Sequence, residues 1–572
     1  MRRLTRLIVP PVSGAARDLL RTDAYTSCCA LTGIKALPAV FGDDFVRSTV
    51  ATSGQGMHSS ATFSDNPRSG RLTWVWFFVG AVLLPFALVQ TMLPLAAWLA
   101  PIFLLRFART APRAWVTFPA IFLAEAIGSW IAGRGGDPGN IYVALIGLGI
   151  FAVFRGFASM LPYAADRLIG SRLDQGTRVF VFPLAFTTID WLMSLLPKVN
   201  TTESTVYSQY DSLALIQIVS VTGMWGLAFL IGWFASTVNA LWDRGFDWRP
   251  VRGAVIPFAA ALIAVLLFGS IRLNFAVPSA PTVMAATVTI DRAVHDKAIS
   301  PPFDWITFNR STDAERAAVR PQIRATAEQM LERTETALRA GAKIVGWQEA
   351  GAFVLEEDRQ GLLDRAAALA KQNNAYMQIS LGVFTRTTTM PYFLNQSILI
   401  DNSGNIVWTY EKTYPVFPTE THVAPYGPGR LPFSDTPHGR FSTAICNDFH
   451  FPMLIRQAGR NDVDIMMAPY SDVHPFEQQD AVVAIMRAVE NGYSMVKATG
   501  IGPSMIVDYQ GRVLGRQNYG DDDGVMLASI PTRGVATIYS RIGDTFAYLS
   551  AAILLLITVR AVGRKHPQRA PI

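Results

Sequence analysis

Half of the 572 residues are hydrophobic and only 16% are charged, which excludes an ordinary water-soluble protein. The apolar residues are concentrated at 72–273 and 544–562, so we predict a membrane protein that carries a large polar domain. The formal net charge of +7 does not indicate nucleic-acid binding, because the positive charges fall in short loops between apolar runs.

Residues 1–70 contain many Arg, Ser, Thr and Gly residues and show no sustained apolar period. We predict a disordered cytoplasmic tail, because such a segment cannot bury enough apolar surface to fold. Its basic start is not followed by a hydrophobic stretch of signal-peptide length. Cys28 and Cys29 lie in this tail and are interpreted as incidental thiols.

Eight apolar segments are each near the length that crosses a bilayer. Arginine and lysine residues cluster after the second, fourth, sixth and eighth segments, and the other connections are nearly free of them. By the positive-inside rule, both termini are expected in the cytoplasm. The predicted segments are 72–89, 92–107, 115–132, 140–163, 178–196, 220–242, 253–273 and 544–562. The predicted domains are a tail at 1–70, a seven-span membrane domain at 71–273, an extracytoplasmic domain at 274–543, and an eighth span with a cytoplasmic tail at 544–572.

Charged side chains inside these segments need partners, because an isolated charge in hydrocarbon is costly. Glu125 and Arg155 lie at similar depth on consecutive antiparallel segments. We expect an internal pair between them that packs the helices, rather than a transport site.

Residues 281–530 alternate between short apolar, β-branched stretches and longer stretches rich in Ala, Glu and Arg. The NSGN turn at 402–405 joins two of the apolar stretches as a hairpin. Alternating strands and helices mixed with hairpins indicate an α/β sheet domain with helices on both faces.

Three chemically different side chains follow predicted strands of this domain: Glu349 after IVGWQ, Lys412 after IVWTY and Cys446 after FSTAI. Together they can perform acyl transfer: the carboxylate takes the thiol proton, the thiolate attacks a carbonyl, and the ammonium stabilises the oxyanion. The helix-like PMLIRQAG after Cys446 is expected to favour the thiolate through its N-terminal dipole. Taken singly, a buried cysteine is more often structural, so the inference depends on the three residues meeting.

At these residues the chain resembles the nitrilase superfamily, whose members use a Glu-Lys-Cys triad on an α-β-β-α sandwich. With its membrane segments it is similar to the integral-membrane branch, the apolipoprotein N-acyltransferases. The resemblance implies Glu349 as general base, Lys412 as the ammonium and Cys446 as nucleophile. It implies that Glu420, eight residues after Lys412, helps to position the triad. The motifs that carry it are GWQEAG, YEKTYPVFPTE and ICND.

The chain departs from the family's pattern beside the triad. Gln348 stands where the family usually has proline, Asn447 where it has tyrosine, and Asp448 where it has glutamate. Asn447 and Asp448 are therefore predicted as supporting or substrate-binding residues, and the identity of the acyl acceptor stays open. Residues 414–429 are either a long loop or a lid over the pocket. The histidines show no zinc-ligand spacing, so His422, His450 and His474 are interpreted as surface groups or groups that support a site.

The resemblance implies an enzyme of the bacterial inner membrane whose catalytic domain faces outward. It would move a fatty acyl chain from a phospholipid, through a Cys446 thioester, to the α-amino group of an apolipoprotein's N-terminal diacylglyceryl-cysteine. No metal or organic cofactor is expected, and a monomer is favoured. One alternative is a membrane-tethered amidase of the nitrilase type that uses water as acceptor. Another is a non-enzymatic membrane protein with a decayed nitrilase domain.

Overall fold

The computed structural model describes residues 67–88, 91–133, 141–275, 280–300, 308–417, 419–472, 476–518 and 524–563. These residues belong to the second of the chain's two compact units, Asn66–Ile572. Most of the predicted tail, with Cys28 and Cys29, lies outside the described residues, as does His474.

A helix forms at each of the eight predicted apolar segments, because an apolar stretch must satisfy its backbone groups internally. Within the described part of the chain, four helical stretches are long and apolar enough to cross a membrane: 114–132, 224–242, 249–275 and 545–563. The helices are α1 (Pro67–Leu83), α2 (Pro94–Thr110), α3 (Ala114–Ala132), α4 (Ile141–Gly170), α6 (Val181–Ser194), α9 (Met224–Trp242), α10 (Arg252–Phe275) and α17 (Thr545–Gly563).

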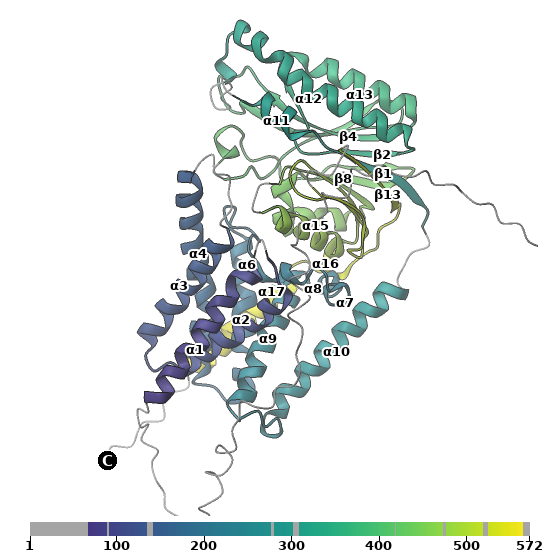
Figure 1. Cartoon of the computed structure of the whole chain (residues 1–572). Helices are drawn as coiled ribbons and strands as arrows, with labels where there is room; N and C mark the ends of the chain where they lie inside the picture. Colours follow the sequence, from purple (N-terminus) through teal and green to yellow (C-terminus); the bar gives the residue numbers. More distant parts are fainter. Residues whose placement is uncertain are drawn as a thin grey trace, which may run out of the picture. The chain divides into compact units, whose positions relative to one another are not determined.

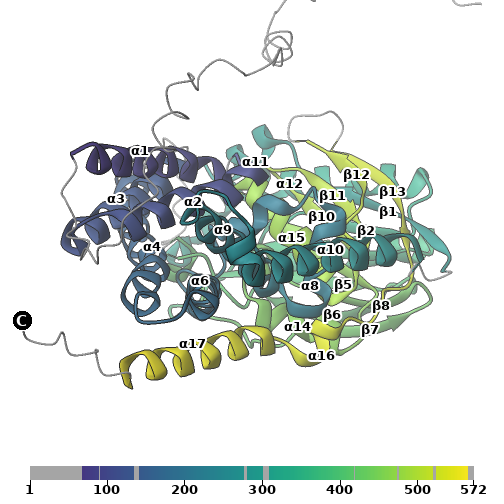
Figure 2. The same ribbon diagram turned by 90° about the horizontal axis from the view of Figure 1, so that it is seen from below.

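Helix α9 is the most enclosed of the four spanning candidates, with 72% of its apolar window buried. It packs against α2, α6 and α10, and α17 runs along α6 (Figure 2). By contrast, α10 and α17 have only 17% of theirs buried. Their outward side chains, such as Ile263 and Leu556, therefore suit a lipid environment.

Among the described residues, Glu125 and Arg155 form no ion pair within 4 Å, although the charge of Arg155 does act on the Glu125 carboxylate. Arg155 Nη2 instead lies 3.2 Å from Asp190 Oδ1 and donates to the Glu203 carbonyl at 3.2 Å. Helix α4 packs against both α3 and α6, and the carboxylate within ion-pair distance of Arg155 comes from α6, the next apolar helix along the chain, rather than from α3.

Short helical turns lie between the helices of this bundle. They are η2 (Leu84–Ala87), α5 (Gln175–Arg178), η4 (Thr205–Gln209), α7 (Leu213–Ile216), α8 (Val219–Thr222) and η5 (Arg249–Val251).

The polar domain contains two sheets that pack face to face. The first has the order β13-β1-β2-β4-β5-β6, with β3 paired to β4, and the second has the order β12-β11-β10-β9-β8-β7. Val283, Ile344 and Leu399 of the first sheet form one buried cluster with Ile465 and Val496 of the second. The strands of the first sheet are β1 (Thr282–Val288), β2 (Ile344–Trp347), β3 (Ala352–Leu355), β4 (Tyr376–Phe384), β5 (Phe393–Ile400), β6 (Ile406–Glu411) and β13 (Val525–Pro531). Those of the second are β7 (Phe433–Thr436), β8 (Gly439–Thr443), β9 (Ile465–Tyr470), β10 (Ser494–Thr499), β11 (Ser504–Val507) and β12 (Val513–Gln517).

Helices cover both outer faces of this sandwich (Figure 1). The first sheet is covered by α12 (Asp313–Arg339) and α13 (Arg359–Asn373), and the second by α14 (Pro452–Arg460) and α15 (Glu477–Asn491). The predicted α-β-β-α sandwich is thus confirmed. Shorter helices are α11 (Arg292–Ala298), η6 (Phe308–Arg310), η7 (Glu356–Asp358), η8 (Glu420–His422), η9 (Cys446–His450) and α16 (Ile538–Ile542).

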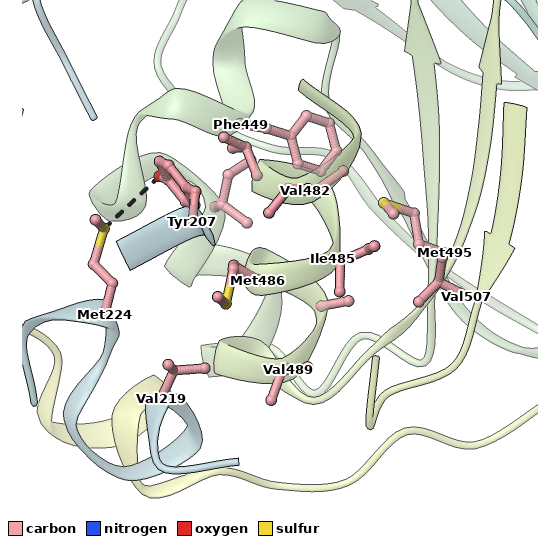
Figure 3. Close-up of a cluster of buried hydrophobic side chains, with 14 of the residues drawn as sticks. Tyr207, Val219, Met224, Phe449, Val482, Ile485, Met486, Val489, Met495 and Val507 are labelled. Carbon is pink, nitrogen blue, oxygen red and sulfur yellow. Dashed lines mark hydrogen bonds between the residues drawn. The ribbon is translucent and has the colours of Figure 1, made fainter. Parts of the chain in front are cut away.

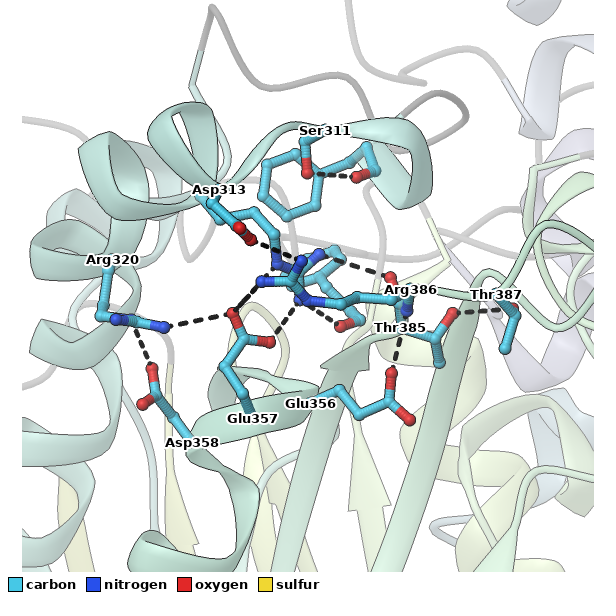
Figure 4. A network of polar contacts seen from close by, with 12 residues as sticks. Ser311, Asp313, Arg320, Glu356, Glu357, Asp358, Thr385, Arg386 and Thr387 are labelled. Carbon is cyan, nitrogen blue, oxygen red and sulfur yellow. Dashed lines mark hydrogen bonds and ion pairs between the residues drawn. The ribbon is translucent and has the colours of Figure 1, made fainter.

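Helix α12 begins at a local sequence signal. Thr312 and Glu315 form a capping box: Thr312 Oγ1 accepts from the Glu315 N–H at 3.3 Å, and Glu315 Oε2 accepts from the Thr312 N–H at 2.7 Å. A charge network then joins this helix to the segments after β3 and β4 (Figure 4). In it, the buried Arg316 donates to both oxygens of Glu357, which also pairs with Arg386.

The core of the second sheet's helical layer continues into the apolar part of the chain. Tyr207, Val219 and Met224 pack in the same cluster as Phe449 and Met486 (Figure 3). Consequently the outer face of α15 is covered by residues of η4, α8 and the start of α9, rather than by solvent.

Candidate active site

The three predicted residues lie just beyond strand ends in both sheets. Glu349 follows β2 by two residues and Lys412 follows β6 directly, whereas Cys446 follows β8 of the other sheet and opens η9. The Glu349 N–H donates to the carbonyl of Tyr470, the last residue of β9, at 3.1 Å. This hydrogen bond links the two sheets beside the site.

A buried carboxylate and ammonium meet here. Lys412 Nζ lies 2.7 Å from Glu349 Oε1 and 2.7 Å from Glu420 Oε2. The Lys412 and Glu349 side chains are only 3% and 4% exposed. The structure therefore brings together Glu349, Lys412 and Glu420, which are separated by up to 71 residues in the sequence.

Asn395 belongs to the same cluster and was not predicted. Its Nδ2 donates to Glu349 Oε1 at 2.7 Å, and its backbone carbonyl accepts from the Lys412 N–H at 3.0 Å. Among the described residues, its Oδ1 has no hydrogen-bond partner. The available signal was a run of polar residues, Asn395 to Ser397, within a strand whose other residues are apolar.

Burial disfavours the thiolate form of Cys446, whereas the sequence predicted that a helix dipole would favour it. Burial raises its pKa well above the usual value, and the carboxylate of Glu349 raises it further, against the opposing charge of Lys412. The dipole argument fails because a 3₁₀ turn follows Cys446 and helix α14 begins only at Pro452. A base is therefore required before this sulfur can attack.

Glu349 has the properties of that base. Burial raises the pKa of its carboxyl, an effect that the neighbouring Lys412 ammonium partly opposes. For Lys412, burial acts to lower the pKa, but the carboxylates of Glu349 and Glu420 more than compensate and hold it well above its usual value. The ammonium thus stays charged where a developing oxyanion would need it.

Asp448 and Asn447 tie the cysteine turn to the segment after β6. Asp448 Oδ2 accepts from the Tyr410 hydroxyl at 2.7 Å and the Ile445 N–H at 3.0 Å, and its Oδ1 accepts from the Tyr414 N–H at 2.8 Å. Asn447 Nδ2 donates to the Tyr414 carbonyl at 3.0 Å. Burial raises the pKa of Asp448 to about 6, against these hydrogen bonds.

A cavity of about 40 Å³ adjoins the Lys412 side of the cluster. Asn395, Lys412 and Glu420 line it together with Pro415 and Tyr426 of the 414–429 segment. The segment is fixed at one point by Tyr414, whose ring stacks on Phe451 with centroids 3.5 Å apart. It therefore forms a wall of the cavity.

Gln348 and His450, which the sequence analysis also named, have structural partners. The Gln348 side chain accepts from the Ile290 N–H at 2.8 Å, which fixes the end of β2 relative to the chain after β1. His450 Nε2 lies 2.8 Å from Asp480 Oδ1, and His422 ends η8. Within the described residues, no group of three or more His, Cys, Asp or Glu side chains is arranged to hold a metal ion.

Two separate parts of the chain match known protein families. Residues 316–539 match the carbon-nitrogen hydrolase family, and residues 80–237 match the apolipoprotein N-acyltransferase N-terminal domain. The chain is 25% identical to the apolipoprotein N-acyltransferase of Bradyrhizobium diazoefficiens over 71% of its length and 78% of the relative's. It is 23% identical to that of Geobacter metallireducens over 74% and 81%. A solved amidase of the nitrilase superfamily from Nesterenkonia is 17% identical over 48% of this chain and 98% of that one, with a TM-score of 0.37.

Proposed function

Because the chain belongs to the apolipoprotein N-acyltransferases, the membrane branch of the carbon-nitrogen hydrolase superfamily, we propose that it N-acylates lipoproteins. The acyl donor is a phospholipid, and the acceptor is the α-amino group of an N-terminal diacylglyceryl-cysteine. The observation that carries the proposal is the buried Glu349–Lys412 pair, 2.7 Å apart, whose charges both act on the Cys446 thiol.

In the first half-reaction, Glu349 takes the thiol proton and the Cys446 sulfur attacks the ester carbonyl of the phospholipid. Lys412 stabilises the oxyanion of the tetrahedral intermediate. As that intermediate collapses, the carbon–oxygen ester bond breaks, and the leaving lysophospholipid oxygen takes the proton from Glu349. The products are a thioester on Cys446 and a free lysophospholipid.

In the second half-reaction, the acceptor amine attacks the thioester carbonyl and gives a proton to Glu349. The carbon–sulfur bond then breaks, the sulfur takes the proton from Glu349, and the amide product leaves. Through both steps, Lys412 is kept in position by Glu420 and Glu349 by Asn395. The cysteine turn is kept in position by Asp448 and Asn447. Since donor and acceptor use the same pocket in turn, ping-pong kinetics follow.

The membrane arrangement belongs to the same proposal. Eight spans, seven at 71–273 and one within 544–572, would place both termini in the cytoplasm and residues 274–543 on the outer face of the inner membrane. The loop charges support this orientation. Both lipid substrates can then reach a monomer's site from the bilayer without crossing water.

The decisive experiment follows the acyl group on the purified full-length protein. Wild type incubated with labelled phospholipid should gain the mass of one acyl chain, which hydroxylamine removes. Cys446→Ser should gain no hydroxylamine-labile adduct, whereas the Cys28→Ser/Cys29→Ser variant should behave as wild type. Labelling that follows Cys28 or Cys29 instead would refute the assignment.

Adding a diacylated lipopeptide then separates the proposal from the membrane-tethered amidase. Transfer predicts that the thioester persists in water and is discharged by the lipopeptide amine to an amide. Rapid discharge to free fatty acid, at a rate unaffected by the lipopeptide, would favour the amidase.

A further inference from the structure

The backbone of Cys446 is held in an uncommon conformation. Its φ is +44°, in the left-handed region, which costs a non-glycine residue about 1–3 kcal/mol and persists only where the surroundings enforce it. Asp448 holds the start of the five-residue turn η9 through the three hydrogen bonds described above. The other end of the turn is His450, so the contacts of His450 decide whether the turn is fixed at both ends.

His450 is buried and held from two directions. Its backbone carbonyl accepts from Thr201 Oγ1 at 3.0 Å, and its Nδ1 lies 3.4 Å from Thr202 Oγ1. On the opposite side of the ring, Nε2 lies 2.8 Å from Asp480 Oδ1. Two of the three contacts therefore come from the segment between α6 and η4, some 250 residues earlier in the chain.

Four of the five residues of that segment, 200–204, are buried, and two of the five have left-handed backbone angles. Asn200 and Glu203 have φ angles of +48° and +63°. Glu203 is 2% exposed and accepts from Ser129 Oγ at 2.6 Å, and Ser204 Oγ donates to Asp190 at 2.7 Å. Two left-handed residues in a buried polar stretch indicate a geometry that the surrounding helices enforce.

The hydroxyl of Thr201 is oriented toward the catalytic turn by a second hydrogen bond. Thr201 Oγ1 accepts from the Tyr207 hydroxyl at 2.7 Å, and Arg487 Nη2 donates to the Tyr207 oxygen at 3.2 Å. Since a threonine hydroxyl carries a single proton, Thr201 directs that proton to the His450 carbonyl.

We propose that Thr201 is a positioning residue for acyl transfer. Its hydrogen bond fixes the His450 end of η9 and thereby the place of the Cys446 sulfur relative to Glu349 and Lys412. The connection between α6 and η4 thus sets the geometry of the nucleophile. This inference rests on the proposed function of Cys446 as the acylated residue.

The test compares two threonines of the same segment in the full-length protein. Thr201→Val removes the hydroxyl at nearly constant volume, and Thr201→Ser keeps it. Thr205→Val is the matched control, because Thr205 Oγ1 is buried without a hydrogen-bond partner among the described residues. The rate of thioester formation is measured against phospholipid concentration for each variant.

Thr201→Val is expected to lower the maximal acylation rate about 10- to 100-fold, as small misplacements of reacting groups do. Its KM for phospholipid should stay within about twofold, and Thr201→Ser should recover most of the rate. Equal rates in Thr201→Val and Thr205→Val, or loss without rescue by Ser, would overturn the proposal. If Thr201→Val does not accumulate, Tyr207→Phe replaces it, since it removes the donor that orients the Thr201 hydroxyl.

A second readout separates this proposal from the proposed function. In a Cys28→Ser/Cys29→Ser background, the rate of Cys446 alkylation by iodoacetamide reports the environment of the sulfur without any lipid. A wild type that forms no acyl adduct would refute the proposed function. A normal adduct in wild type, together with unchanged alkylation and acylation in Thr201→Val, would refute only the role of Thr201.

Discussion

The ion pair between Lys497 and Asp472 provides a sharp test of how this domain is stabilised. Lys497 lies within β10, and its Nζ is 2.6 Å from Asp472 Oδ2, 3.4 Å from the Pro503 carbonyl and 4.3 Å from the centre of the Tyr470 ring. Both charged side chains are fully buried. Asp472 Oδ1 has no hydrogen-bond partner among the described residues, and the charge of Lys497 is the largest effect that favours the ionised carboxylate.

Replacing Lys497 by methionine leaves that carboxylate buried without a counterion. Removing one partner of a buried pair costs about 3–5 kcal/mol. For a domain of this size, that corresponds to a fall of about 6–20 °C in the unfolding midpoint. The double variant Lys497→Met/Asp472→Asn removes both charges and should recover most of the loss.

The pH dependence of this deficit has a definite sign. Burial raises the pKa of Asp472, and the charge of Lys497 opposes that rise, so Lys497→Met raises the pKa further. A carboxyl whose pKa is higher in the folded than in the unfolded state destabilises the folded state when it is ionised. This loss of stability becomes smaller on acidification, because the carboxyl is then protonated in the folded state. The variant's deficit should therefore be largest at pH 8 and smaller at pH 6.

The assay is intrinsic-fluorescence melting of the full-length protein in detergent at both pH values. A Lys497→Met midpoint within about 2 °C of wild type at pH 8 would refute the reasoning, because less than about 1 kcal/mol would then depend on the pair. A double variant as unstable as the single one would show that lost packing, not the unpaired charge, is responsible.

Three further predictions concern the base, the cysteine turn and the polar network. Because burial raises the pKa of Glu349 above 4.5, the rate of Cys446 acylation should fall on acidification with a midpoint above that pH. An acylation rate that does not change between pH 5 and pH 8 would contradict this. Asp448→Asn places an amide N–H₂ among the buried donors that the carboxylate now accepts from, so the free energy of unfolding should fall by about 1–3 kcal/mol and the melting midpoint with it. An unchanged midpoint would contradict the role of Asp448 in holding the cysteine turn. Arg316→Met should cost about 1–3 kcal/mol, whereas Arg365→Met, whose ion pair is half exposed, should cost less than about 1 kcal/mol; equal melting shifts would contradict the role of burial.

Some features of the site were predictable because they depend on local sequence. Glu349, Lys412 and Cys446 each follow a run of residues that favours a strand, and a strand end is recognisable without knowledge of its neighbours. The N-terminus of α12 at Thr312 is similarly local, since its capping box spans four residues.

Other features were not predictable because they depend on distant segments. In the sequence, Asn395 cannot be distinguished from other strand residues. Its contacts with Glu349 and Lys412 arise only because β5 lies beside β6 and near the end of β2. The raised pKa of Cys446 follows from burial, whereas the sequence predicted a helix dipole that would lower it and that the 3₁₀ turn does not supply. His450 gained a role only when residues 200–204 were brought against it.

The sequence by itself determined the apolar segments that form helices, the alternation that forms two sheets, and the order of an acid, an amine and a thiol. Hydrophobic periodicity and covalent order are properties of residues that are close in the sequence, so they can be recognised without the structure. Only the tertiary structure decided which charges meet: Lys412 with Glu349 rather than with solvent, and Arg155 with Asp190 rather than with Glu125. Electrostatic energies depend on distance and burial in space, and both are set by how the sheets and helices pack.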